Sequence, residues 1–297
     1  MKKNRKKRTG LGVSLTVLIT FAILIPGKVM AQASIFSYLE QALTKIITQS
    51  TIVNLANYDY VSGNCLFGVY LAKGSSHSLN MHFDKDVTYL VLAAGDDDII
   101  DMDLALLSSA GTLLQKDTEN DATPLLHFTP NYSGNMTLKI SNYNSARAGF
   151  CVMVVLRQSS SGNFSMYEIA QALDNVIKNA QITYLFSSRF ARGTFCLFGG
   201  RLSKGADTYL YNTQPPPGEY AMVGAGSNNL SDVDLFIVKQ RQRDYISGTE
   251  IAKDTATDNH PLCTFTVYRD RYYLLKHKNY SSRGDSPGFV FSILLEL

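Results

Sequence analysis

Carboxylates are concentrated in one short stretch, GDDDIIDMDL at residues 95–104. Calcium in proteins takes about six to eight oxygen ligands, and several of them are carboxylates that converge on one loop. The stretch and the strand predicted after it supply six aspartates: Asp96, Asp97, Asp98, Asp101, Asp103 and Asp117. One hypothesis is a calcium site. The other is a turn at the start of a strand, in which the carboxylates accept hydrogen bonds from backbone N–H groups.

A second copy of this stretch allows a comparison. Residues 224–235 read GAGSNNLSDVDL, against AAGDDDIIDMDL at 93–104. Asp232 and Asp234 are kept, whereas the first three aspartates become Ser227, Asn228 and Asn229. The kept pair falls on one face of a strand, which favours the structural interpretation. The three additional aspartates of the first copy leave the calcium site as an alternative hypothesis for that copy.

Catalytic motifs are not evident. The sequence contains neither His-Glu-x-x-His nor Gly-x-Ser-x-Gly, and no acid, base or nucleophile is spaced to work with the aspartates. The histidines are scattered, and we expect them in solvent or on strand faces: His77, His82, His127, His260 and His277. We therefore predict that the chain is not an enzyme and needs no cofactor other than the calcium considered above.

Two surface segments are candidates for binding a partner. In YLYNTQPPPGEY, residues 209–220, Tyr209 and Tyr211 alternate onto one face, three prolines stiffen the loop, and Tyr220 follows. Tyrosines beside a rigid loop suit a sugar or a peptide; the alternative is a strand pair joined by a stiff turn. SSRGDSPG, residues 281–288, places Arg283 and Asp285 in a sequence similar to the cell-attachment site of fibronectin. There the alternative is a polar hairpin tip.

The N-terminus resembles an export signal. MKKNRKKR is followed by an uncharged run from Leu11 to Ile25, a Pro-Gly pair and small residues that end at Ala31, which is typical of a secretory signal peptide over residues 1–31. An uncleaved anchor is the alternative. Removing seven of the 28 basic residues leaves 21 against 25 acidic ones, a net charge of −4 in place of +3. We therefore expect a secreted or periplasmic protein that does not bind nucleic acid and does not span the membrane after cleavage.

Four cysteines in an exported chain indicate disulfides. Cys65 opens the first predicted strand of the first copy and Cys151 lies in its last, so we predict a Cys65–Cys151 bridge. Cys196–Cys263 is the matching prediction for the second copy. Buried free thiols are the alternative.

The mature chain is a tandem duplication. CLFG occurs at residues 65–68 and again at 196–199, a shift of 131 residues. After a six-residue insertion near Arg241, a shift of 137 carries Asn142-Tyr143 onto Asn279-Tyr280. We predict repeat 1 over residues 32–157, a Ser/Gly linker over 158–163 and repeat 2 over 164–297.

Each repeat is predicted to be an amphipathic helix followed by β-strands. Apolar residues recur at the helical period over 35–50 and 165–180. Alternating runs separated by turn residues fill 60–157 and 190–297. Short strands without helices between them indicate a mainly β fold, with two tandem antiparallel β-sandwiches of jelly-roll type. We expect each helix to pack on its own sandwich; a membrane or partner helix is the alternative.

Each β region resembles the bacterial pre-peptidase C-terminal domain. The resemblance rests on the Lys-Gly turns at 73–74 and 204–205, on TYLVLAAGDDDIIDMDL, and on PLLHFTPNYSGNMTLKISN. Repeat 2 departs from it, because TVYRDRYYLLKHKN lacks the Ser-Gly turn. The resemblance implies a β-sandwich that accompanies secreted peptidases, and some relatives in clostridial collagenases bind collagen and calcium.

No peptidase is attached here, so these inferences lead to a non-catalytic binding protein. We expect it to recognise a protein, glycan or matrix partner outside the cell or at the envelope. An accessory to a separately encoded secreted enzyme is the alternative, and a hydrolase without a recognisable motif is a third hypothesis. The sequence does not indicate an oligomeric state.

Overall fold

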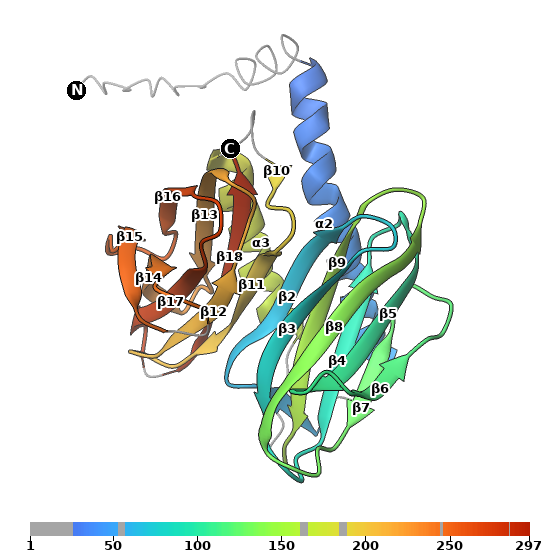
Figure 1. The fold of residues 1–297 in the computed structure, drawn as a ribbon. Helices are drawn as coiled ribbons and strands as arrows, with labels where there is room; N and C mark the ends of the chain where they lie inside the picture. The colour runs from blue at the N-terminus through green and yellow to red at the C-terminus, as the bar shows by residue number, and fades with distance from the viewer. Residues whose placement is uncertain (1–25, 53–56, 161–165, 184–188, 244–245, 285) are drawn as a thin grey trace, which may run out of the picture.

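The computed structural model of the chain describes residues 26–52, 57–160, 166–183, 189–243, 246–284 and 286–297. These residues form a mainly β protein with two helices, as predicted (Figure 1). Residues 1–25 of the predicted signal peptide lie outside the described part, and residues 26–31 belong to the first helix. Neither described helix is both long and apolar enough to cross a membrane.

One large sheet runs through both repeats. Its main path has the order β7 (Leu125–Phe128), β4 (Tyr89–Gly95), β9 (Gly149–Gln158), β2 (Gly63–Leu71), β11 (Phe195–Leu202), β18 (Gly288–Glu296), β13 (Gly218–Gly226) and β16 (Leu262–Val267). Two short strands pair at its side, β1 (Tyr58–Tyr60) with β9 and β10 (Arg189–Phe190) with β18. The first four strands of the path come from repeat 1 and the last four from repeat 2, so the sheet joins the repeats.

Each repeat completes a sandwich with a smaller sheet of four strands. In repeat 1 the order is β3 (Ser76–Phe83), β8 (Gly134–Ser145), β5 (Ile99–Ser108) and β6 (Leu113–Asp117). In repeat 2 it is β12 (Asp207–Thr213), β17 (Tyr273–Ser282), β14 (Leu230–Gln240) and β15 (Gly248–Asp254). Buried and accessible residues alternate along β8 and β17, because one face of each small sheet meets the core and the other meets solvent.

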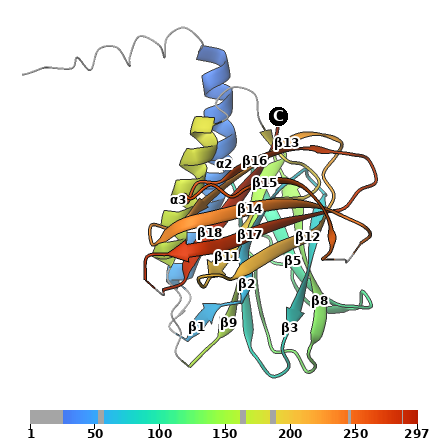
Figure 2. The same cartoon turned by 90° about the vertical axis from the view of Figure 1, so that its left-hand side faces the viewer.

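A pseudo-twofold axis passes through the junction of the repeats. There β2 pairs antiparallel with β11, and Phe67 lies opposite Phe198, its own counterpart in the duplication. The register therefore matches each CLFG segment with the other. Glycine is required beside the axis, since a Cβ on Gly199 would lie 2.0 Å from the carbonyl oxygen of Val290. Figure 2 shows that the strands of the two repeats are inclined to each other, as expected in a twisted sheet.

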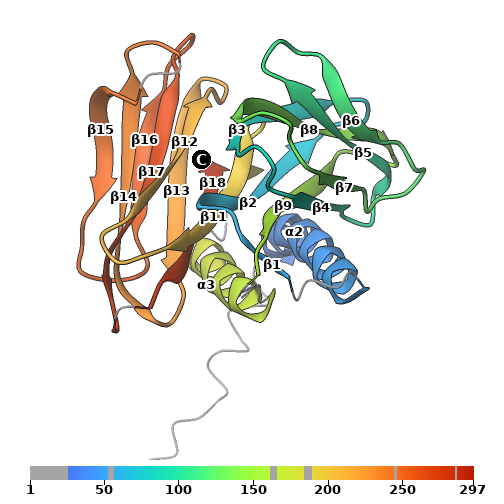
Figure 3. The same ribbon diagram turned by 90° about the horizontal axis from the view of Figure 1, so that it is seen from below.

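The helices cover the face of the large sheet opposite the smaller sheets (Figure 3). Helix α2 (Pro26–Ile52) packs on β4 and β9, and α3 (Met166–Thr183) packs on β13 and β18. Helix α2 contains the predicted helix 35–50, and α3 contains residues 166–180 of the other, whose residue 165 lies outside the described part. Their apolar stripes are buried, with Phe36, Leu39 and Ile46 on α2 fully covered. Strand β4 is buried along its whole length, because α2 lies on one of its faces and the sandwich core on the other.

The predicted disulfides are wrong, since all four cysteines are free thiols in the core. On β2 the residue opposite Cys151 is Val69, four residues beyond Cys65. Four strand residues span about 13 Å, far more than the Cβ separation that a disulfide bridges. Cys196 and Cys263 lie on β11 and β16, with β18 and β13 between them. Burial raises the pKa of the Cys65, Cys196 and Cys263 thiols to about 12. Burial also raises the pKa of Cys151, so all four thiols pack as small apolar groups.

Candidate ligand-binding groove

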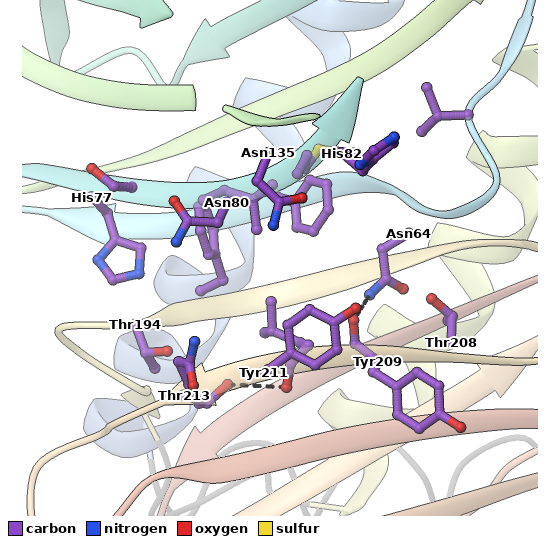
Figure 4. A pocket seen from close by; sticks show the side chains of 18 of the residues that line it. Asn64, His77, Asn80, His82, Asn135, Thr194, Thr208, Tyr209, Tyr211 and Thr213 are labelled. Atoms are coloured by element: carbon purple, nitrogen blue, oxygen red, sulfur yellow. Dashed lines mark hydrogen bonds between the residues drawn. The ribbon is translucent and has the colours of Figure 1, made fainter. Parts of the chain in front are cut away.

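A groove with a volume of about 1000 Å³ lies where the two repeats meet. Strands β3 and β12 line its two walls, and β2 and β11 contribute to its floor. In the described part of the chain, β3 and β12 are edge strands, each paired with one neighbour only. Figure 4 shows side chains of both walls around this space. The groove exists only because β2 pairs with β11, which brings these two edges together.

The wall from repeat 2 is aromatic. Tyr209 and Tyr211 alternate onto the same face of β12, as predicted, and their rings stack with centroids 6.3 Å apart and planes inclined by 15°. On the neighbouring strand, the Lys276 ammonium lies 5.3 Å from the Tyr209 ring centroid and 2.7 Å from a carboxylate oxygen of Asp207. The lysine and the aspartate hold Tyr209 in place, while Tyr211 is 47% exposed.

The wall from repeat 1 carries amides, hydroxyls and imidazole. Ser78, Asn80 and His82 are exposed on the outward face of β3, and Asn135 joins them from β8. The Asn80 Oδ1 atom accepts a hydrogen bond from the Thr137 hydroxyl at 2.7 Å, so the amide is oriented before any ligand arrives. This wall therefore offers hydrogen-bonding groups that carry little charge.

The floor links the repeats through side chains as well as backbone. The Asn64 amide on β2 donates a hydrogen bond to the carbonyl oxygen of Tyr209 on β12 at 2.9 Å. His77 on β3 meets the edge of Phe195 on β11, with centroids 4.6 Å apart. Burial lowers the pKa of His77 and keeps it neutral near pH 7. These contacts fix the two walls relative to each other and pre-form the groove.

Tyr220, predicted to bind a partner with the other two tyrosines, is not available to one. It is fully buried on β13, and its hydroxyl donates a hydrogen bond to the carbonyl oxygen of Pro216 at 2.8 Å. Burial raises its pKa to about 12. Strand β13 lies inside the large sheet between α3 and the sandwich core, so its tyrosine stabilises the proline loop from within.

Four of the five aspartates of residues 96–103 have separate protein partners. Asp96 is buried and accepts hydrogen bonds from the backbone N–H of Phe150, at 2.6 Å, and of Asp98, at 3.0 Å. Ion pairs join three others to different cations, Asp97 to Lys45, Asp98 to Arg147 and Asp103 to Lys116. Within the ranges that the structure describes, no three His, Cys, Asp or Glu side chains lie together as a metal site.

The second copy supports the turn interpretation of these aspartates. Ser227 replaces Asp96, and its hydroxyl accepts the hydrogen bond from Phe289 that corresponds to the one from Phe150. Asp117 accepts a hydrogen bond from the N–H of Leu125 at 2.7 Å, and Asp254 does the same in repeat 2 for Leu262 at 2.8 Å. A neutral hydroxyl serves in place of a carboxylate, so the turn requires an acceptor more than a charge.

Two buried carboxylates remain incompletely paired. Asp101 and its counterpart Asp232 each bury one oxygen, Oδ1, that has no hydrogen-bond partner among the residues the structure describes. Burial raises the pKa of both, and neighbouring aspartates raise it further. Because the same feature occurs in both repeats, it belongs to the shared strand start and not to the extra charge of repeat 1.

The fibronectin-like segment lies at the hairpin between β17 and β18, away from the residues that line the groove. Arg283 is exposed, and its backbone N–H donates to the carbonyl oxygen of Asn229 at 2.7 Å. Asp285 lies outside the described residues. The hairpin position agrees with a turn at this segment.

Sequence reasoning identified Tyr209 and Tyr211 but missed the opposite wall. Asn80 and Asn135 carry no motif, and they line the same groove as the tyrosines only because β2 pairs with β11. The repeated CLFG, with its glycines Gly68 and Gly199, and the extra Gly200 after the second copy were the available signal. A strand that must approach another backbone closely is typically marked by such glycines.

Comparison with known proteins adds distant structural likenesses. No protein-family model and no curated protein sequence matches the chain. Among solved structures, the M60 catalytic domain with two CBM51 domains of Clostridium perfringens ZmpB aligns at 6% identity and a TM-score of 0.26, over 82% of this chain and 38% of that one. The CBM22 tandem of Paenibacillus barcinonensis Xyn10C aligns at 9% identity and 0.23, over 77% and 92%. The PBSX exported protein XepA aligns at 9% identity and 0.27, over 82% and 88%.

Proposed function

We propose that this chain is an exported, non-catalytic binding protein whose ligand site is the groove between the two repeats. The groove itself carries the proposal. Its volume of about 1000 Å³ lies within the usual range of ligand sites, and its walls are edge strands with an aromatic face on one side and amides on the other. Contacts of the floor fix both walls, which lowers the cost of ordering on binding.

The chemistry of the groove supports binding more than catalysis. Its two histidines have assigned neighbours, since His77 packs on Phe195 and the imidazole of His82 lies 3.5 Å from a carboxylate oxygen of Asp84. His77 is kept neutral by burial, and His82 is exposed on the rim. The four thiols lie in the core with raised pKa values, which suppress the thiolate that a nucleophile needs.

Export is the second part of the proposal. It rests on the basic and apolar N-terminal sequence, which is typical of a secretory signal. The resemblance of each repeat to a pre-peptidase C-terminal domain and the calcium site of repeat 1 stay predictions. A binding function in the groove requires neither of them.

Hydrogen–deuterium exchange tests where a ligand binds. The full chain would be mixed with three probes in turn: a neutral soluble polysaccharide (hydroxyethyl cellulose), an acidic one (polygalacturonate) and gelatin as an unfolded polypeptide. A ligand in the groove should slow exchange in peptides from β3 and β12, because their outer edges pair with no other strand among the described residues. Peptides from β6 and β15, the far edges of the same small sheets, are the internal control. Protection confined to other strands, or no protection with any probe, would contradict the proposal.

A further inference from the structure

We infer that the groove binds an extended neutral glycan, with sugar rings stacked on Tyr211 and hydroxyls hydrogen-bonded to the amide wall of repeat 1. The inference rests on the proposed function and names its ligand class. Three observations support it: the composition of the groove lining, the fixed orientation of the tyrosine rings, and the different side chains of the two repeats at equivalent positions.

The lining is polar but nearly uncharged. Of the 28 described residues that line the groove, 11 are Ser, Thr, Asn or Gln and four are Tyr, whereas three of them, Asp84, Arg157 and Arg243, are charged. A sugar without acidic groups presents hydroxyls that both donate and accept, and amides and hydroxyls match both roles. An acidic polymer would instead favour a basic lining, since cations next to its charges supply most of the attraction.

The tyrosine rings are already oriented to stack on the apolar face of a sugar. A pyranose ring exposes C–H groups on one face, and a rigid aromatic ring covers that face at low entropic cost. The Tyr209 ring has Lys276 and its stacked neighbour Tyr211 beside it, and the lysine charge is balanced by Asp207 at 2.7 Å. Tyr211 is left 47% exposed at the groove.

The two walls of the groove carry different side chains at positions that are equivalent in the duplication. The shift of 131 residues places Ser78 at the position of Tyr209 and Asn80 at that of Tyr211. The backbone around the axis is therefore nearly twofold, while one wall is aromatic and the other carries amides. A glycan has the same two-sided character, with an apolar ring face and a rim of hydroxyls. A second copy of this chain would bring an identical surface and would not match two unlike walls.

Binding constants for the three probes test the ligand class. Affinity electrophoresis and calorimetry on the full chain would use the wild type, Tyr211→Ala and Asn80→Ala. Tyr143→Ala is the matched control, an exposed tyrosine of β8 that does not line the groove. We expect hydroxyethyl cellulose to bind, with a loss of about tenfold for Tyr211→Ala and about fivefold for Asn80→Ala, and no change for the control.

The salt dependence of the affinity distinguishes a neutral ligand from a charged one. Between 50 and 500 mM NaCl we expect the affinity for hydroxyethyl cellulose to change by less than about twofold, because charge contributes little to this binding. If gelatin or polygalacturonate binds in the groove and hydroxyethyl cellulose does not, the glycan inference is overturned and the proposed function stands. If no probe binds, or if binding is unchanged in both groove variants, both fail.

Discussion

Repeat 2 buries a polar pair, His277 and Ser292, and replacing it tests whether the core holds His277 in its neutral form. His277 on β17 is fully buried, with Nε2 2.9 Å from the hydroxyl of Ser292, the ring stacked on Phe198 at 4.7 Å, and Nδ1 without a partner. The equivalent positions of repeat 1 hold Ile140 and Met153, both in the core. The double variant His277→Ile with Ser292→Met therefore replaces the pair by side chains that the fold already accepts.

The free energy of unfolding should depend less on pH in this variant. Burial lowers the pKa of His277 to about 3, whereas the unfolded chain binds the same proton with a pKa of about 6.5. Between these values the unfolded state carries more protons, so stability is lost as the pH falls below about 6.5. Each pH unit costs about 1.4 kcal/mol, and the loss at pH 5 is about 2 kcal/mol relative to pH 8.

Urea unfolding at pH 8, 6.5 and 5 measures this difference. Other groups titrate in both proteins, so the informative quantity is the stability of the variant minus that of the wild type at each pH. We expect this difference to rise by about 2 kcal/mol from pH 8 to pH 5 in favour of the variant. Parallel pH profiles would refute the assignment of His277 as a neutral histidine held in the core.

Three further predictions concern stability and the core. Gly199→Ala should destabilise the chain by more than about 2 kcal/mol, because its Cβ would strike the backbone of β18, whereas Gly134→Ala, with no atom within 3.4 Å, should stay within about 0.5 kcal/mol in the same melts. Asp96→Ala should cost about 1–3 kcal/mol by leaving the N–H of Phe150 unpaired, and Asp96→Ser, which copies Ser227, should recover most of it; a thermal shift on adding calcium that these variants abolish would instead establish the calcium hypothesis. All four cysteines should react with a thiol reagent only after unfolding, and labelling should need no reductant.

Local pattern explains most of what the sequence could predict. The duplication follows from repeated segments such as CLFG. The two amphipathic helices and the β class follow from periodicity, and Tyr209 and Tyr211 share a face because side chains alternate along a strand. Tyr220 was a candidate because it follows the proline loop, but it lies on β13, an inner strand covered on both faces, where position next to a loop says nothing about exposure. His277 was expected in solvent or on a strand face; it lies on the core face of β17, where a hydroxyl partner satisfies one of its nitrogens.

Pairing between strands far apart in sequence was the part that could not be predicted. A sandwich model of each repeat leaves the register of β2 against β9 open, and the disulfide prediction assumed a register that places Cys65 beside Cys151. The groove depends on one further pairing, that of β2 with β11 across the repeats. Nothing in either strand alone encodes its partner, because both carry the same four residues.

The register in which each CLFG strand pairs with its own counterpart suggests how such a chain can arise. An isolated repeat would expose the edge of its β2 strand, and open edges pair readily with other chains. Because Phe67 meets its own counterpart at the axis, two identical repeats could close that edge against each other as an isologous homodimer. The tandem chain is the covalent form of that dimer. Fusion makes the association independent of protein concentration, and it lets each half mutate alone.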